Sequence, residues 1–300
     1  MLSTRPLVFA ASALALGLAA CQSTPPPGDL TDDAGRAVVL EATPERVLPL
    51  APNLTELVAA AAGVDRLAAV SQSDTYPPGV AELETFTSFP LDFERVVQLD
   101  PDLALASSDV NTVSQADRLA ELGIPSFVFT FNEVADVPRA LRQLDEILGS
   151  DGGERVATDI ERRVAFVTRT VTGFVPPRVL VLAGDDALYA FGRDSYASEL
   201  VRLAGGENLT DAYGGSAAQP GEEDVIRMGP EVIFVLAGDD YDPADLLEKH
   251  PTFFTLPAMQ TGRVYGIDPD LVSRPGPRVV DGLERIARHL HPTAFADGAA

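Results

Sequence analysis

The chain has 300 residues, and its 45 Asp and Glu against 22 Lys and Arg give a formal net charge of −23. A nucleic-acid-binding face needs clustered Lys and Arg, so this charge balance argues against one. With one cysteine, Cys21, the chain can form neither a disulfide scaffold nor a multi-cysteine metal site. The hydrophobic content of 46% is typical of a folded chain with one large domain or two medium ones.

Residues 1–20 have the features of a secretory leader. Arg5 gives a short positive start, and the apolar run from Leu7 to Leu16 is too short to span a bilayer as a mature helix. The run ends in Leu18-Ala19-Ala20-Cys21, which resembles the lipobox of bacterial lipoproteins, where the cysteine is diacylated and becomes the mature N-terminus. An ordinary signal peptide with a chance cysteine is the alternative. We expect the Pro-rich residues 21–37 to form a flexible tether to the membrane.

Two segments of the folded part recur later in the chain. Arg46-Val47-Leu48-Pro49-Leu50-Ala51 returns at an offset of 132 (178 − 46) as Arg178-Val179-Leu180-Val181-Leu182-Ala183. The segment Glu94-Arg95-Val96-Val97, with Pro101-Asp102 after it, returns at an offset of 129 (223 − 94) as Glu223-Asp224-Val225-Ile226 with Pro230-Glu231. Two matches in the same order indicate two similar lobes.

Short β runs alternate with helical periodicity in both halves, which is typical of α/β units with a largely parallel sheet. In the first half we expect a strand at 47–50, a helix starting at an Asn53/Glu56 N-cap pair and ending at Gly63, strands at 67–70, 102–106 and 126–130, and helices at 93–99 (capped by Asp92) and 112–122. In the second half we expect strands at 179–182, 232–236 and 264–267, helices at 196–204 and around 226–228, and a final helix from Pro277 to about residue 290.

Residues 154–170 have amphipathic helical spacing and lie between the two halves. The expected fold is therefore α/β, with two similar three-layer α/β lobes joined by a single long helix and a ligand cleft between the lobes. The expected boundaries place the N-terminal lobe at 38–149, the linker helix within 150–174 and the C-terminal lobe at 175–296.

The order of several short motifs resembles that of the periplasmic binding proteins that bind cobalamin or ferric siderophores for ABC importers. The resemblance covers about Val38 to Pro292. It is carried by the segments Leu50-Ala51-Pro52-Asn53-Leu54-Thr55-Glu56-Leu57, Ser73-Asp74-Thr75-Tyr76-Pro77, Phe93-Glu94-Arg95-Val96-Val97, Gly192-Arg193-Asp194-Ser195-Tyr196, Gly205-Gly206-Glu207-Asn208 and Arg274-Pro275-Gly276-Pro277-Arg278.

Glu94 and Glu223 are the first set of candidate functional residues. In the resembled family, one Glu on each lobe docks into an Arg pocket of a dimeric permease, and both positions match here. A two-fold symmetric receptor needs two equivalent contacts, and complementary charge fixes their register. The alternative is that both are first-turn acids stabilised by a helix dipole, typically by only about 0.3–1 kcal/mol.

Aromatic and arginine side chains that follow predicted strands are the second set. The resemblance places Tyr76, Phe89, Tyr189 and Arg274 on cleft positions of the cobalamin-binding members, and we add Arg193 and Tyr196 to the candidate ligand contacts. Aromatic walls suit a large multi-ring ligand. Ordinary core packing is the alternative for each aromatic side chain. The chain departs from the family at Ser107 and at Ala217-Ala218, where those members carry Trp, and it has no Trp at all.

Two acidic pairs, Asp185-Asp186 and Asp239-Asp240, follow the repeated sequence Val-Leu-Ala-Gly on the expected ligand side. Four acids opposite Arg193 and Arg274 favour a neutral or cationic ligand over a strongly anionic one. The alternative is that these acids are solvated loop residues of an acidic protein.

The function expected from these features is that of a substrate-binding lipoprotein of an ABC importer. It captures a metal-chelate ligand, with a corrinoid favoured, and delivers it to a permease dimer. A ferric hydroxamate siderophore or haem is the alternative ligand, and a structural envelope lipoprotein has less support. We expect an extracytoplasmic monomer held at the membrane by its lipid anchor, with no nucleic acid partner, no cofactor and no resident metal. The chain lacks a nucleophile elbow or phosphate loop, so we expect no enzyme.

Overall fold

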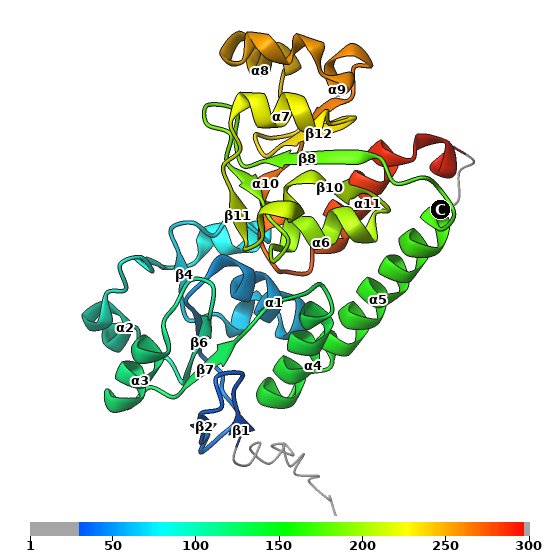
Figure 1. Ribbon diagram of the computed structural model, residues 1–300. Coiled ribbons are helices and arrows are strands. Elements are labelled where there is room, and N and C mark those ends of the chain that lie inside the picture. Colours follow the sequence, from blue (N-terminus) through cyan, green and yellow to red (C-terminus); the bar gives the residue numbers. More distant parts are fainter. Residues whose placement is uncertain (1–29, 297–300) are drawn as a thin grey trace, which may run out of the picture.

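The computed structural model describes residues 30–296, which form two α/β lobes, one above the other in Figure 1. The expected two-lobe fold is confirmed. The lower lobe contains β1 (Leu30–Thr31), β2 (Ala37–Val38), β3 (Val47–Pro49), α1 (Pro52–Ala62), β4 (Val70–Ser71), β5 (Thr85–Phe86), α2 (Phe93–Leu99), β6 (Leu103–Ser107), α3 (Val113–Glu121), β7 (Ser126–Phe129) and α4 (Asp136–Leu148).

Helix α5 (Gly152–Val171) leads from the lower lobe to the upper one. The upper lobe contains β8 (Arg178–Leu182), β9 (Ala190–Phe191), α6 (Tyr196–Leu203), β10 (Glu207–Asn208), β11 (Ala217–Ala218), α7 (Glu222–Met228), β12 (Val232–Val235), α8 (Pro243–Lys249), α9 (Pro257–Gln260), β13 (Val264–Gly266), α10 (Pro269–Ser273) and α11 (Val279–Leu290). Short 3₁₀ turns connect several of these elements.

The central sheets of the two lobes share a core of three parallel strands, β3-β6-β7 in one and β8-β12-β13 in the other. In the lower lobe the parallel order is β3-β6-β7, with β4 and β5 forming a separate parallel pair. In the upper lobe the order is β11-β9-β8-β12-β13, and β10 also pairs with β8. The strands β8, β10, β12 and β13 are parallel, whereas β9 and β11 run antiparallel to their neighbours. All residues of β6, β7 and β12 are buried, as expected for strands covered by helices on both faces.

The internal repeat is visible in the register of these sheets. Val47 pairs with Leu103 in the lower lobe, and Val179 pairs with Val232 in the upper lobe. The polar contacts repeat as well. The backbone N–H of Arg46 donates to the Asp102 carboxylate over 3.0 Å, and that of Arg178 donates to Glu231 over 2.9 Å. The two sequence matches therefore occupy equivalent places, which explains why both recur.

Most predicted elements are present, with shifts at their ends. Helix α1 begins at Pro52, which suits a first helical position, so Asn53 lies inside the first turn and the N-cap is Ala51. In place of a strand over 67–70, Leu67 forms one isolated bridge and the strand is β4. The last helix begins at Val279, after Pro277. Asp92 caps α2 as expected.

The first described residues belong to the fold, so the expectation of a tether reaching residue 37 is wrong for 30–37. Strands β1 and β2 form an antiparallel pair. Buried Asp32 accepts a hydrogen bond from the backbone N–H of Val128 over 3.2 Å and forms an ion pair with Arg36 over 3.0 Å. These bonds hold the segment against β7. The polar composition of the segment gave no sign of this contact.

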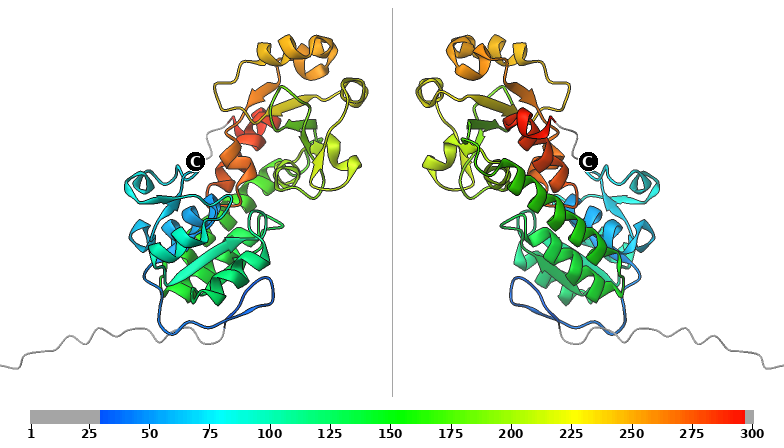
Figure 2. Two further views of the ribbon diagram at one scale, coloured as in Figure 1. Left: turned by 90° about the vertical axis from the view of Figure 1, so that its left-hand side faces the viewer. Right: turned by 90° about the vertical axis from the view of Figure 1, so that its right-hand side faces the viewer.

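Helix α5 is joined to the lower lobe by its first turn. It packs against α4 and α1 at one end and against α11 further along, as the two side views in Figure 2 show. A Cβ atom at Gly152 would overlap the carbonyl oxygen of Ala61, and one at Gly153 would overlap that of Leu141. The Asp145 carboxylate accepts the backbone N–H groups of Gly153 and Glu154 over 2.9 and 2.7 Å, which satisfies donors that the helix itself leaves free. No helix within residues 30–296 is long and apolar enough to cross a membrane.

Substituting Gly153→Ala should destabilise the protein, because the added methyl group would meet the Leu141 carbonyl and push α5 away from α4. We expect the free energy of unfolding to fall by about 1–3 kcal/mol, measured by thermal or urea denaturation. Gly184→Ala is the matched control, since a Cβ there has no neighbour within 4 Å. Equal stability of the two variants would contradict this account of the α5 anchor.

Candidate functional site

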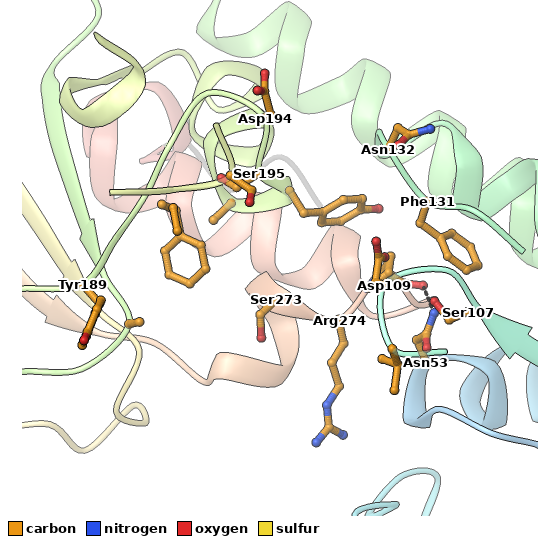
Figure 3. Close-up of a pocket in the computed structure, with 18 of the residues that line it drawn as sticks. Asn53, Ser107, Asp109, Phe131, Asn132, Tyr189, Asp194, Ser195, Ser273 and Arg274 are labelled. Carbon is orange, nitrogen blue, oxygen red and sulfur yellow. Dashed lines mark hydrogen bonds between the residues drawn. The ribbon is translucent and has the colours of Figure 1, made fainter. Parts of the chain in front are cut away.

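A cavity of about 570 Å³ lies between the two lobes. Residues after β6 and β7 and at the start of α1 line it from below, and residues around β9, the start of α6, β11 and the end of α10 line it from above. Figure 3 shows side chains from both lobes around this space. Ligands of open α/β sheets bind beyond the carboxyl ends of the strands, and β6 and β7 end here. The expected cleft is therefore present.

Aromatic side chains form much of the cavity wall. Tyr189 and Phe191 on or beside β9, Tyr196 at the start of α6, and Phe131 after β7 all line it. The side chain of Tyr189 is 54% exposed, so its ring is free to contact a ligand. The Tyr196 hydroxyl is buried, and among the residues that the structure describes it has no hydrogen-bond partner. Burial, with a smaller contribution from the nearby Glu199, raises its pKa well above the usual value, so it is a neutral donor.

Charge in the cavity is sparse. Asp109 and Asp194 are the acids of its described lining, and Arg274 is the base. The Arg274 guanidinium contacts the Asp270 carboxylate over 2.9 Å, and burial raises the pKa of Asp109. The remaining polar groups are neutral, contributed by Asn53, Ser107, Asn132, Ser195, Ser216 and Ser273. Such a lining suits a ligand that has many neutral polar groups and little negative charge.

Three of the six predicted ligand contacts lie in this wall and three do not. Tyr189, Tyr196 and Arg274 line the cavity. Arg193 is exposed and stands beside the lining residue Asp194, and it is not itself part of the described lining. Phe89 is 79% exposed in the turn before α2, outside the lining. The positions where the chain lacks Trp, Ser107 and Ala217, do line the cavity.

Tyr76 takes part in a contact at the junction of the lobes instead. The Arg278 guanidinium lies over the Tyr76 ring, 4.4 Å from its centroid, a cation–π geometry. The same guanidinium donates to both carboxylate oxygens of Glu56, over 2.9 and 2.6 Å. Glu56 is buried on α1 of the lower lobe, whereas Arg278 precedes α11 of the upper lobe. Asn53 adds a bond to the Pro275 carbonyl over 3.4 Å.

The acidic pairs after β8 and β12 are not part of the described cavity lining, so the cavity does not support a role for them opposite Arg274. Asp185 and Asp186 both form ion pairs with Lys249 on α8, over 2.7 and 2.6 Å. The hydrogen bond from Lys249 is the main cause of the lowered pKa of Asp185. Asp239 pairs with Arg285 on α11. Asp185, Asp186 and Asp239 are thus paired with bases of their own lobe.

The six predicted contacts leave out most of the cavity wall, including Asp109, Phe131, Asn132 and Asp194. The signal was available for three of them. Asp109, Phe131 and Asn132 follow the carboxyl ends of β6 and β7, the position from which parallel sheets present ligand-binding residues. Within residues 30–296, no cluster of three or more His, Cys, Asp or Glu side chains could hold a metal ion.

Glu94 and Glu223 occupy the same position on equivalent helices. Each is the second residue of a seven-residue helix, α2 or α7, and each is exposed. Across residues 30–296 neither carboxylate has a hydrogen bond or an ion pair with another side chain, although both helices carry an arginine that pairs with a different acid, Arg95 with Glu84 and Arg227 with Asp224. Cys21 lies outside the described residues.

Comparison with protein families accounts for this architecture. The family model described as "Periplasmic binding protein" matches residues 48–271, three quarters of the chain. The chain belongs to the periplasmic binding protein family. The match runs from β3 in the lower lobe to α10 in the upper lobe, so it includes every residue that lines the cavity except the last three, Ser273, Arg274 and Pro275.

Two curated relatives cover nearly the whole chain. One is an uncharacterized ABC transporter substrate-binding lipoprotein of Bacillus subtilis (strain 168), 26% identical over 281 residues, which are 90% of this chain and 88% of that protein. The other is a vitamin B12-binding protein of Pectobacterium carotovorum, 30% identical over 263 residues, which are 86% of this chain and 92% of that protein.

Solved structures share the fold. The periplasmic vitamin B12-binding protein BtuF of Vibrio cholerae superposes with a TM-score of 0.72 at 24% identity, covering 84% of this chain and 98% of that one. The periplasmic haem-binding protein RhuT of Roseiflexus, in its apo form, superposes with a TM-score of 0.71 at 24% identity, covering 83% and 99%. Proteins with different ligands thus use this arrangement of lobes, so the ligand depends on the side chains of the cavity.

Breaking the Glu56–Arg278 pair should lower stability in a pH-dependent way. Burial raises the pKa of Glu56 even with Arg278 beside it. A carboxyl with a raised pKa in the folded state stabilises the fold at low pH, and that stabilisation is lost as the pH rises through the folded pKa. We expect Arg278→Gln to reduce the free energy of unfolding, relative to the parent, by about 3 kcal/mol near neutral pH and by much less below the ordinary glutamate pKa of 4.5.

Denaturant titrations over this pH range measure the effect. The double variant Glu56→Gln, Arg278→Gln is the control, because it removes the carboxyl that titrates and should abolish the extra pH dependence. If Arg278→Gln loses the same stability at every pH, the explanation that this variant leaves Glu56 buried and unpaired would be contradicted.

Proposed function

We propose that this protein is the substrate-binding lipoprotein of an ABC importer, and that it binds a corrinoid such as cobalamin in the cavity between its lobes. In this proposal the mature chain begins at Cys21, is held at the outer face of a membrane by lipid on that residue, and works as a monomer that delivers its ligand to a permease dimer. Family membership and the lipoprotein relative support the general role.

The observation that carries the corrinoid assignment is the composition of the cavity wall. Two carboxylates stand against one guanidinium, so the wall repels a tricatecholate ferric siderophore with its high negative charge. A corrinoid has little net charge, a broad ring face and many amide side groups. The Tyr189, Phe191 and Phe131 rings suit its apolar faces, and the asparagine and serine side chains suit its amides.

Haem is another candidate ligand, because Tyr189 and Tyr196 in the wall each have a phenol oxygen, which can serve as an axial ligand of haem iron. The two haem propionates favour nearby cations, however, and the described wall offers Arg274, which is engaged with Asp270. Charge therefore ranks haem behind the corrinoid. A ferric hydroxamate complex, with low charge but less ring surface, ranks between them.

Cobalamin should bind purified protein lacking residues 1–21, and its intense colour should co-elute with the protein through a desalting column at about one ligand per chain. Ferric hydroxamate and haemin are run in the same way. A colourless protein fraction with cobalamin, together with retention of either other ligand, would overturn the corrinoid assignment and leave the general role intact.

Tyr189→Ala and Arg274→Ala should each weaken the binding of that ligand by about tenfold, because each removes contact area or a donor from the cavity wall. Phe89→Ala and Arg193→Ala are the matched controls, an exposed aromatic and an exposed arginine outside the described lining, and should change affinity by less than about twofold. Titration of the absorbance spectrum measures all four. If the control variants lose as much affinity as the wall variants, the proposal that the ligand binds in this cavity would be contradicted.

We further propose that Glu94 and Glu223 dock the loaded protein on the permease, one glutamate for each subunit. Their exposure, their lack of partners among residues 30–296 and their equivalent positions in the two lobes support this role. Replacing both by Ala should abolish ligand uptake by cells while leaving ligand affinity unchanged, because neither side chain lines the cavity. Loss of ligand affinity in the double variant would contradict the separation of docking from binding.

A further inference from the structure

Helices α2 and α7 match each other beyond their glutamates. Compared residue by residue from their first positions, Phe93–Gln98 and Glu222–Arg227 have the same order of exposure: half-buried, exposed, half-buried, buried, exposed, exposed. Both helices also end before a residue in the left-handed region, Asp100 and Gly229. The two lobes thus present the same helical face to their surroundings.

The fifth position of that face is aliphatic in both helices and is exposed in both. Val97 has 46% of its surface exposed and Ile226 has 40%. Each stands three residues after the unpaired glutamate, so acid and aliphatic side chain are neighbours on the helix surface. A single exposed aliphatic residue is common on soluble proteins and needs no explanation. Recurrence at equivalent places beside Glu94 and Glu223 is what distinguishes this pair.

An exposed phenylalanine accompanies each helix, although the two come from different elements. Phe89, 79% exposed, lies in the turn that leads into α2. Phe254, 61% exposed, lies on the 3₁₀ turn Pro251–Thr255, which packs against α7 and is tied to it by a bond from Thr252 to Glu222 over 2.7 Å. Neither ring lines the cavity between the lobes. Phe89 was predicted to be a cleft residue but does not line the cavity, and Phe254 is its counterpart in the other lobe.

We propose that α2 and α7 each present a composite contact, made of the unpaired glutamate, the exposed aliphatic residue and the exposed phenylalanine, to one partner with two-fold symmetry. We call these the lower contact (Phe89, Glu94, Val97) and the upper contact (Glu223, Ile226, Phe254). The inference rests on the proposed docking role and adds to it the apolar part of the surface.

The chemistry of these contacts specifies the partner. Each needs a basic group that meets the glutamate and an apolar surface around that group that meets the aliphatic and aromatic side chains. Apolar surroundings exclude water from the ion pair, and a charge pair that loses water gains more from its attraction. Because the two contacts are alike and belong to different lobes, the partner has two like pockets, as a permease dimer does. Charge then controls the rate and orientation of encounter, and apolar area controls how slowly the complex separates.

Binding of the soluble protein to the cognate permease dimer in lipid nanodiscs tests the inference, with affinity measured by interferometry at low and high salt. Val97→Ser with Ile226→Ser should weaken binding by about tenfold through lost apolar burial, with the salt dependence unchanged. Phe89→Ser with Phe254→Ser should act in the same way. Glu94→Gln with Glu223→Gln should instead flatten the salt dependence, because it removes the screened charges.

The matched control is Val113→Ser with Val175→Ser. Val113 is 43% exposed at the start of α3, close to the exposure of Val97, and Val175 is exposed in the segment after α5. This control should bind as the parent does. Thermal unfolding and ligand titration accompany every variant. If a serine variant unfolds early, Val97→Thr with Ile226→Thr replaces it, because threonine keeps the shape of the β-branched side chain.

Apolar variants that bind the permease like the parent, while the glutamine variant does not, would overturn this inference and leave the proposed docking role standing. A control variant that loses as much affinity as the apolar variants would also overturn it, since exposure alone would then explain the effect. A parent protein that binds neither the permease nor any of the three ligands would overturn the proposed function and this inference together.

Discussion

A buried ion pair and one helix hold the lobes in place, and the cavity depends on both. Within residues 30–296 the two lobes share no β-sheet. Glu56 of α1 meets Arg278 before α11, and the guanidinium also covers the ring of Tyr76, so three segments far apart in the chain meet at one point. Removing Arg278 would leave the Glu56 carboxylate buried without its ion-pair partner, which makes the pair important for lobe position as well as for stability.

Features that depend on local chemistry could be predicted from the sequence. The strands and helices, the Asp92 cap and the linker helix follow from periodicity and capping, which are properties of a few neighbouring residues. The duplication was readable because its two segments make the same backbone contacts in each lobe, through Asp102 and Glu231. Tyr189 and Arg274 could be placed in the wall through the family resemblance, and Tyr196 because it lies in a segment that follows a predicted strand.

Features that depend on how segments meet could not be predicted in this way. Tyr76 has the sequence context of a cleft residue, yet Arg278 draws its ring to the junction of the lobes. The acidic pairs follow strands as cleft residues do, but Asp185 and Asp186 form ion pairs with Lys249, and Asp239 forms one with Arg285. Asp32 appeared to be part of a polar tether, and only the position of β7 shows why it is buried. In each case the partner lies more than forty residues away in the chain.

The way α5 begins determines where the molecule can bend. Its first turn is seated on the carbonyl groups of Ala61 and Leu141 with no side chain between, and the Asp145 carboxylate fastens its first N–H groups. Because the backbone of Gly152 and Gly153 packs directly on the backbone of Ala61 and Leu141, α5 and the lower lobe form one rigid unit. At its other contacts α5 meets side chains: Ile160, Val167 and Val171 share a buried core with α11, and Arg163 pairs with Asp281 and Glu284. An opening motion that keeps this backbone seat intact therefore carries α5 with the lower lobe and has to change the side-chain contacts between α5 and the upper lobe.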